Sequence, residues 1–218
     1  MQGSGGETMN TLSAIVKSEN PNLVFLQECS NLPSLIKLSE RRELPNNIIE
    51  GYYNFGTKTR PVEYFVYWRL WTLSDNGNNR CSLGFLIRKE DIKGGRILST
   101  TVDNNARRPF IYFSKDGYNY VNIHATSGGR ENTLNYIECV LRVFKNKKFI
   151  LGGDFNFTPH QLQERNHQLN IYKSGETTQK SGNELDYFVS NTRYNNVTVK
   201  AGAYGNSDHR AVLIEIPK

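Results

Sequence analysis

The chain is divided into many short apolar segments, and this pattern limits the possible folds more than any other feature of the sequence. The segments are rich in Tyr, Phe, Val and Ile, and clusters of Asn, Gly, Asp and Pro separate them, which is typical of β-strands joined by turns. We therefore expect strands at residues 23–27, 64–71, 81–87, 110–113, 120–124, 149–151, 186–189 and 211–216.

Two segments have apolar residues at helical spacing. The first contains Met9, Leu12, Ile15 and Val16, and the Asn20-Pro21 pair is expected to end it. The second runs from about 130 to 144 and places on one face Leu134, Ile137, Val140, Leu141 and Phe144. Many strands and few helices, with some strands apolar on both faces, predict an α/β protein with two packed sheets covered by helices. Because the sequence has no internal repeat or linker, we expect a single domain over residues 1–218.

The composition is that of a globular protein with no membrane span. No apolar run approaches the roughly 20 residues that a transmembrane helix requires. The three cysteines include no CxxC pair, so the sequence indicates neither a zinc site nor a disulfide framework. The formal net charge of +6 and the pI of about 9.2 suit a polyanionic partner such as nucleic acid or phosphoinositide. An ordinary lysine-rich surface gives the same charge.

Polar residues follow or end several of the expected strands. Each has a structural explanation when taken singly, as a solvated strand end, a turn residue or a hydrogen-bonded core histidine. Together their types suit one task, because Mg²⁺ prefers carboxylate and carboxamide oxygens and histidines near neutral pKa can transfer protons. The set therefore predicts metal-assisted hydrolysis of a phosphate ester. Its members are Glu28, His124, Asp154, Asn156, Asp186, Asp208 and His209.

The choice between a structural and a functional role is clearest in the segment KKFILGGDFNFTP, where a strand expected to be buried ends in Asp154 and Asn156. These two residues either cap the following turn or hold something positive. Strand alternation predicts that both side chains share one face while Phe155 turns into the core. Asp208 and His209 are adjacent, so both can serve one site only if they lie in the loop before the last strand.

The motifs FLQE, NIHA, GGDFN and SDH, in this order, resemble the endonuclease/exonuclease/phosphatase superfamily that includes deoxyribonuclease I. Within it, the resemblance is greatest to the active subunits of cytolethal distending toxins, and it extends over nearly the whole chain through NFGTKTRPVEYFVYWRLW, NNRCSLGFLIRK, ARRPFIYF and TTQKSGNELDYFVS. It implies a four-layer α/β sandwich of two packed mixed sheets flanked by helices. It also implies a Mg²⁺-dependent endonuclease that nicks host DNA.

The resemblance assigns a role to each candidate residue. Glu28 and Asp208 would bind the metal, Asp154 would orient the attacking water and take part in the metal shell, and Asn156 would bind phosphate or place the metal. His124 would donate to the phosphate. Asp186 would hold the tautomer of His209, which would act as the base. Arg80 and Arg108 would contact the DNA backbone. For Arg80, and more so for Arg107, the alternative is a strand-end arginine that faces water.

The resemblance also leaves alternatives open. In the superfamily, a first strand ending in Trp-Asn precedes the loop that MQGSGG resembles, so an N-terminally truncated domain is implied, as a fragment, a misplaced start or a degenerate copy. Phosphoinositide phosphatase activity and a non-catalytic binding role are the alternatives to a nuclease. A toxin of this kind implies delivery subunits as partners and secretion from a bacterium into a host cell, with action in the nucleus. The opening residues contain no signal peptide.

Overall fold

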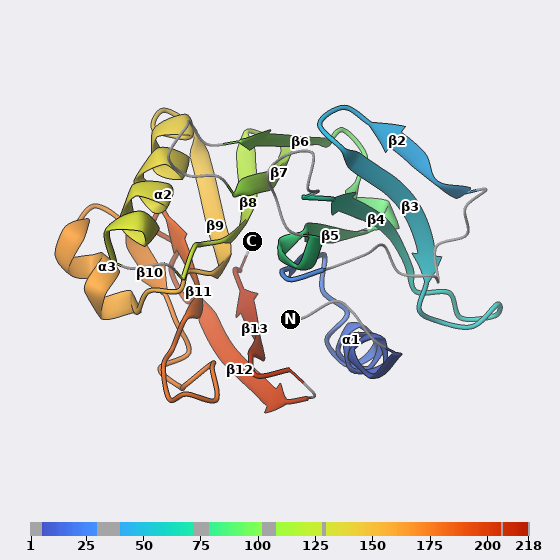
Figure 1. Cartoon of the computed structure of the whole chain (residues 1–218). Coiled ribbons are helices and arrows are strands. Elements are labelled where there is room, and N and C mark those ends of the chain that lie inside the picture. The colour runs from blue at the N-terminus through green and yellow to red at the C-terminus, as the bar shows by residue number, and fades with distance from the viewer. Residues whose placement is uncertain are drawn as a thin grey trace.

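The computed structural model of the chain describes residues 6–29, 40–71, 79–101, 108–127, 130–205 and 207–217. Three helices and thirteen strands form in these residues (Figure 1). The helices are α1 (Gly6–Glu19), α2 (Arg130–Val143) and α3 (Pro159–Arg165). The strands are β1 (Leu23–Leu26), β2 (Arg42–Leu44), β3 (Ile48–Asn54), β4 (Glu63–Arg69), β5 (Leu83–Arg88), β6 (Arg96–Thr101), β7 (Pro109–Lys115), β8 (Tyr118–His124), β9 (Lys148–Asp154), β10 (Asn170–Tyr172), β11 (Asp186–Ser190), β12 (Thr198–Tyr204) and β13 (Arg210–Glu215).

The strands form two large sheets and one small one. The first sheet has the order β1-β5-β4-β3-β2, and every neighbouring pair in it is antiparallel. The second has the order β10-β11-β9-β8-β7-β6 and is mixed, because β8 and β9 run parallel with α2 as the crossover between them. β12 and β13 form a separate antiparallel pair. The expectation that both large sheets are mixed was therefore wrong for the first, in which every neighbouring pair is antiparallel.

Three apolar clusters stack the layers of the molecule. Between the two sheets, β5 and β7 meet through buried residues that include Phe85 and Ile111. On the outer side of the first sheet, Val16 of α1 packs against Trp68 of β4. α2 and α3 lie on the outer side of the second sheet (Figure 1). They cover a cluster of buried residues that includes Ile137. The resulting order of helix, sheet, sheet and helices confirms the predicted four-layer α/β sandwich.

The eight expected strands and both expected helices form, with shifts of a few residues at their ends. The strand expected at 149–151 extends to Asp154, and the one expected at 81–87 begins at Leu83 because a 3-10 turn at Asn79–Cys81 precedes it. Five strands were not predicted: β2, β3, β6, β10 and β12. β12 was missed because five of its seven residues are exposed, so it lacks an apolar face. No helix in the described ranges has the length and apolar character needed to cross a membrane.

Gly152 provides a test of how closely the sheets pack. A Cβ atom at this β9 residue would lie 2.5 Å from Cδ1 of Phe188 and 2.9 Å from Cδ2 of Phe25, which reaches across from the first sheet. We expect Gly152→Ala to reduce the free energy of unfolding by about 1–3 kcal/mol, because these rings must move. Gly202→Ala on β12 is the matched control, since its Cβ would meet Ala211 only at 3.5 Å or more. Urea denaturation measures both, and equal effects would contradict the packing explanation.

Candidate active site

Strand register brings three of the predicted residues together. His124 ends β8 and pairs with Asp154 at the end of the parallel strand β9. Asp154 in turn pairs with Asp186, the first residue of the antiparallel strand β11. All three are buried, with 5–7% of each residue exposed. The second sheet therefore collects one histidine and two carboxylates at a single edge.

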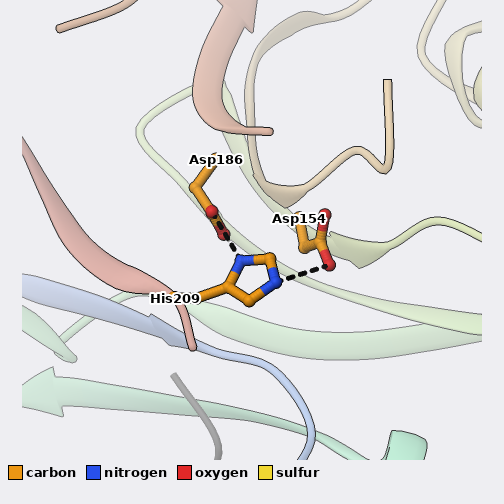
Figure 2. Close-up of side chains that lie close together, drawn as sticks. All are labelled: Asp154, Asp186 and His209. Carbon is orange, nitrogen blue, oxygen red and sulfur yellow. Dashed lines mark hydrogen bonds and ion pairs between the residues drawn. The ribbon is translucent and has the colours of Figure 1, made fainter. Parts of the chain in front are cut away.

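His209 joins this group from the loop before β13, as the sequence predicted. Its Nδ1 lies 2.7 Å from Oδ2 of Asp186, and its Nε2 lies 4.0 Å from Oδ2 of Asp154 (Figure 2). Because a carboxylate accepts the short bond, Nδ1 carries the proton in neutral His209. Nε2 is then the nitrogen that can accept a proton, and it faces Asp154.

Two hydroxyl groups that the sequence reasoning missed fix this pair. Thr178 is fully buried, and its hydroxyl oxygen accepts hydrogen bonds from the backbone N–H groups of Leu185 and Asp186 at 2.9 and 3.0 Å. The hydroxyl of Ser207 accepts from the N–H of His209 at 3.0 Å. These bonds fix the backbone at Asp186 and at His209, and so hold the two side chains in position to meet. The only sequence signal for them was the presence of hydroxyl residues in TTQK and NSDH.

The two buried carboxylates make ionisation costly. Burial, and then the charge of Asp186, raise the pKa of Asp154 to about 7, although His209 and the N–H of Asn156 act in the opposite direction. Burial lowers the pKa of His209, but the hydrogen bond and charge of Asp186, helped by Asp154, outweigh it, so its pKa is raised above the ordinary value. Asp154 therefore holds its proton up to about neutral pH, and His209 binds a proton more tightly than an ordinary histidine does.

His124 lies between Glu28, which comes from the first sheet, and Asp154, which comes from the second. Its Nε2 is 3.5 Å from Oδ2 of Asp154 and 3.9 Å from Oε1 of Glu28. Burial, followed by the positive charges of Arg108, His209 and Arg80, lowers its pKa well below the ordinary value. Its Nδ1 is buried and has no hydrogen-bond partner among the residues that the structure describes. His124 is therefore a neutral imidazole, suited to hydrogen bonding rather than to carrying charge.

Glu28 is the contribution of the first sheet. It follows β1, and its backbone has a φ of 50°, a left-handed conformation that departs from strand geometry. One carboxylate oxygen faces His124, and the other lies 3.4 Å from Nη2 of Arg80, whose side chain is 63% exposed. The site is thus completed only where the two sheets face one another.

Asn156 both caps the turn and lies in the site, so the two alternatives for GGDFN are combined. Its N–H donates to Oδ1 of Asp154 at 2.8 Å, and its Nδ2 donates to the carbonyl of Ala125 at 2.8 Å and to Oδ2 of Asp154 at 3.2 Å. The side chains of Asp154 and Asn156 lie together as expected, but a turn and not strand alternation is the reason, because β9 ends at Asp154 and Asn156 has a φ of 48°. Phe155 is buried as expected, stacked on Tyr187 with ring centroids 4.1 Å apart.

Arg108 and Asp208 differ in placement from the core of the site. Nη1 of Arg108 donates to the carbonyls of His124 and Ala125 at 3.3 and 3.0 Å, so this half-buried arginine braces the end of β8. The side chain of Asp208 is exposed, while the adjacent His209 turns inward. The carbonyl of Asp208 accepts a hydrogen bond from the N–H of Lys180. Arg107 lies outside the described residues.

The donor atoms suit a hard divalent cation. Asp154, Asp186 and His209 form a group that could hold a metal ion, because their ligand atoms lie within 4.8 Å of one another. However, Asp186 and Nδ1 of His209 already satisfy each other. Glu28, Asp154 and Asn156 offer oxygen donors of the type that Mg²⁺ prefers, but Glu28 is not in the group whose ligand atoms lie within 4.8 Å of one another.

No protein-family model matches the chain, and no curated protein matches its sequence. Solved structures, however, share its fold. The cytolethal distending toxin from Actinobacillus actinomycetemcomitans aligns over 99% of this chain and 95% of its own, with a TM-score of 0.78 and 20% identity. The structure described as CdtB, the biologically active subunit of cytolethal distending toxin, aligns over 99% and 93%, with a TM-score of 0.78 and 18% identity.

More distant structures extend the likeness. The 3′ phosphatase NExo from Neisseria, solved with a product DNA hairpin, aligns over 99% of this chain and 96% of its own, with a TM-score of 0.58 and 11% identity. At these identities the likeness is one of fold. The chain therefore has the deoxyribonuclease I-like fold that its motifs predicted.

The raised pKa of Asp154 predicts a pH-dependent gain in stability when its charge is removed. The folded state holds this proton up to about pH 7, whereas the unfolded chain releases it near the ordinary value of 3.8. Ionisation therefore reduces folded-state stability as pH rises from about 4 to 7, by about 1.4 kcal/mol per pKa unit at most. We expect Asp154→Asn to raise Tm at pH 8 in EDTA and to change it little at pH 4. A Tm gain that is equal at both values would contradict this account.

Proposed function

We propose that the protein is a Mg²⁺-dependent phosphodiesterase that nicks DNA, the catalytic subunit of a toxin of the cytolethal distending type. The observation that carries the proposal is the Asp186–His209 pair, held at 2.7 Å beside the buried carboxylate of Asp154 and the neutral imidazole of His124. Such a set supplies a base, a group that orients water and a donor to phosphate, and hydrolysis of a phosphate ester requires all three.

His209 is the proposed general base. Asp186 fixes the proton on Nδ1, which leaves Nε2 to accept a proton from a water molecule between His209 and Asp154. The carboxylate of Asp154 accepts a hydrogen bond from the same water and directs its oxygen toward phosphorus. The raised pKa of His209 increases the affinity of Nε2 for the proton that it takes.

His124, Asn156 and Arg80 are the proposed phosphate ligands, and Arg108 supports them. A neutral His124 donates one N–H to a phosphate oxygen without bringing a positive charge into a buried position. The side-chain amide of Asn156 lies near His124, because it donates to the carbonyl of the next residue, Ala125. Arg80 is exposed enough to reach a DNA backbone, whereas Arg108 supports the phosphate ligands by holding the carbonyl of His124.

Mg²⁺ would be held by Glu28 and Asp154, with Asn156 and Asp208 contributing to its surroundings. When bound, it supplies charge stabilisation at the phosphate and at the leaving oxygen. In this arrangement it would also offset the mutual repulsion of the buried carboxylates.

Three observations support DNA as the substrate and a toxin as the context. The chain has a net charge of +6, which suits a polyanion. Its fold is that of the cytolethal distending toxin subunit, and a protein of related fold was solved with a DNA hairpin. We accordingly propose delivery subunits as partners, secretion by a bacterium and action on nuclear DNA of a host cell. We also propose that residues 1–218 form a single domain.

A plasmid-nicking assay tests the catalytic roles. We expect the parent protein to convert supercoiled DNA to the nicked form in Mg²⁺ and to lose this activity in EDTA. Replacing either histidine, as His124→Ala or His209→Ala, should lower the rate by about 10²–10⁴-fold, because each removes a group that acts in the transition state. His160→Ala is the matched control, since that histidine on α3 is 81% exposed and lies outside the site.

Two outcomes would contradict the proposal. Nicking at the parent rate by both active-site variants would show that a contaminant cleaves the DNA. Release of phosphate from inositol lipids in the absence of any nicking would leave the site catalytic but assign it to the phosphoinositide substrate.

The pH profile tests the pairing of Asp186 with His209. The base must be deprotonated, so the rate should rise with pH through the pKa of His209, above 6.5. Asp186→Asn removes the hydrogen bond and the charge that raise this pKa. We expect the rising limb to move to lower pH while the maximal rate falls by about 10²-fold or more, because the tautomer is no longer held. An unchanged limb in kcat against pH would exclude His209 as the group that titrates.

A further inference from the structure

The interior between the two sheets is not wholly apolar, because a buried asparagine crosses it. Asn122 of β8 is fully buried, and its Nδ2 donates to the carbonyls of Leu26 at 3.0 Å and Gly84 at 2.9 Å. Its Oδ1 accepts from Nε2 of Gln27 at 2.6 Å. Leu26 and Gly84 are register partners on β1 and β5, so one side chain of the second sheet is hydrogen-bonded to the backbones of two adjacent strands of the first.

This network lies directly beneath the candidate site. Gln27 immediately precedes Glu28, and Asn122 precedes His124 by two residues, so the side chains of Asn122 and His124 project from the same face of β8. The network therefore joins the backbone that carries Glu28 to the strand that carries His124. A second buried hydrogen bond joins the sheets, from Nε of Arg69 on β4 to Oγ of Ser99 on β6 at 3.3 Å, but it involves neither β8 nor the backbone beside Glu28.

Gly153 makes room for this contact. A Cβ atom at Gly153, which has a φ of 134°, would lie 2.1 Å from the carbonyl oxygen of Ile123 and 3.1 Å from Nε2 of Gln27. A larger residue would push Gln27 away from Asn122 and displace the backbone that leads to Asp154. The second glycine of GGDFN is thus required first by its φ and by the carbonyl of Ile123 on the neighbouring strand β8, and the side chain of Gln27 from the opposite sheet adds to this requirement.

We propose that Asn122 and Gln27 are positioning residues that set the spacing between Glu28 on one sheet and His124 and Asp154 on the other. The inference rests on the proposed function, because it assigns these residues to the assembly of a divalent-cation and phosphate site. A buried amide pair adds little net stability, because its bonds replace bonds to water. Its geometry is directional, and that property is what a site divided between two sheets requires.

Variants at both positions separate this role from general stability. Asn122→Ala removes the whole network and can prevent folding, so Gln27→Met is the main test variant. It removes the donor to Oδ1 of Asn122 and leaves the two bonds from Asn122 to backbone carbonyls in place. Asn119→Ala is the matched control. Asn119 is also buried on β8 and donates to a carbonyl, that of Lys148 at 3.0 Å, but this bond stays within the second sheet and lies at the opposite end of the strand.

The measurements are the Kd for Mn²⁺, by titration calorimetry, and kcat and KM for DNA nicking. We expect Gln27→Met to weaken Mn²⁺ binding and lower kcat by about tenfold each, with KM changed less than about twofold. Asn119→Ala should lower Tm but leave Kd and kcat at parent values. Equal Kd and kcat in Gln27→Met and the parent would overturn the proposal, as would a parent protein that binds no Mn²⁺ at millimolar concentration. Mn²⁺ binding without hydrolysis would instead contradict the proposed function alone.

A double-mutant cycle with Glu28→Gln identifies the residue through which Gln27 acts. If Gln27 acts by placing Glu28, then Gln27→Met should change Mn²⁺ affinity by less than about twofold when Glu28 is already replaced. Effects that multiply fully would indicate a general loss of structure and would overturn the positioning role.

Discussion

Face-to-face packing of the two sheets is the constraint on which every other feature of this molecule depends. The apolar layer between the sheets, which includes Phe85 and Ile111, is buried by both of them. The outer side of each sheet packs against helical segments. The candidate site is made at one border of this layer, with Glu28 from the first sheet and the remaining groups from the second or from the loop before β13. Neither sheet alone contains the site.

The same packing explains the electrostatics. Asp154 and Asp186 end and begin adjacent strands, so register forces two carboxylates together in a poorly solvated place. Folding must therefore overcome an unfavourable interaction that only a proton, the imidazole of His209 or a cation can relieve. A site that attracts cations and holds protons near neutral pH is thus a direct result of where two strands terminate.

The sequence predicted the layers and most of the site because both depend on local pattern. Apolar runs mark strands, and Glu28, His124, Asp154 and Asp186 stand out since each interrupts or follows such a run. Gln27 and Asn122 were missed for the opposite reason. They lie within strands, and their function depends on partners 95 residues away in the other sheet, which no local pattern specifies. Asp208 and His209 could not be separated from sequence, because only the turn decides which of two neighbours points inward.

The left-handed backbone at Glu28 has a consequence for how the chain can change. A glycine or an asparagine would adopt a φ of 50° more readily than glutamate does. Position 28 is thus one where folding and the proposed chemistry favour different residues. Selection for folding alone would replace the glutamate there, and a lineage released from the need for the reaction would lose its carboxylate while the four layers persisted.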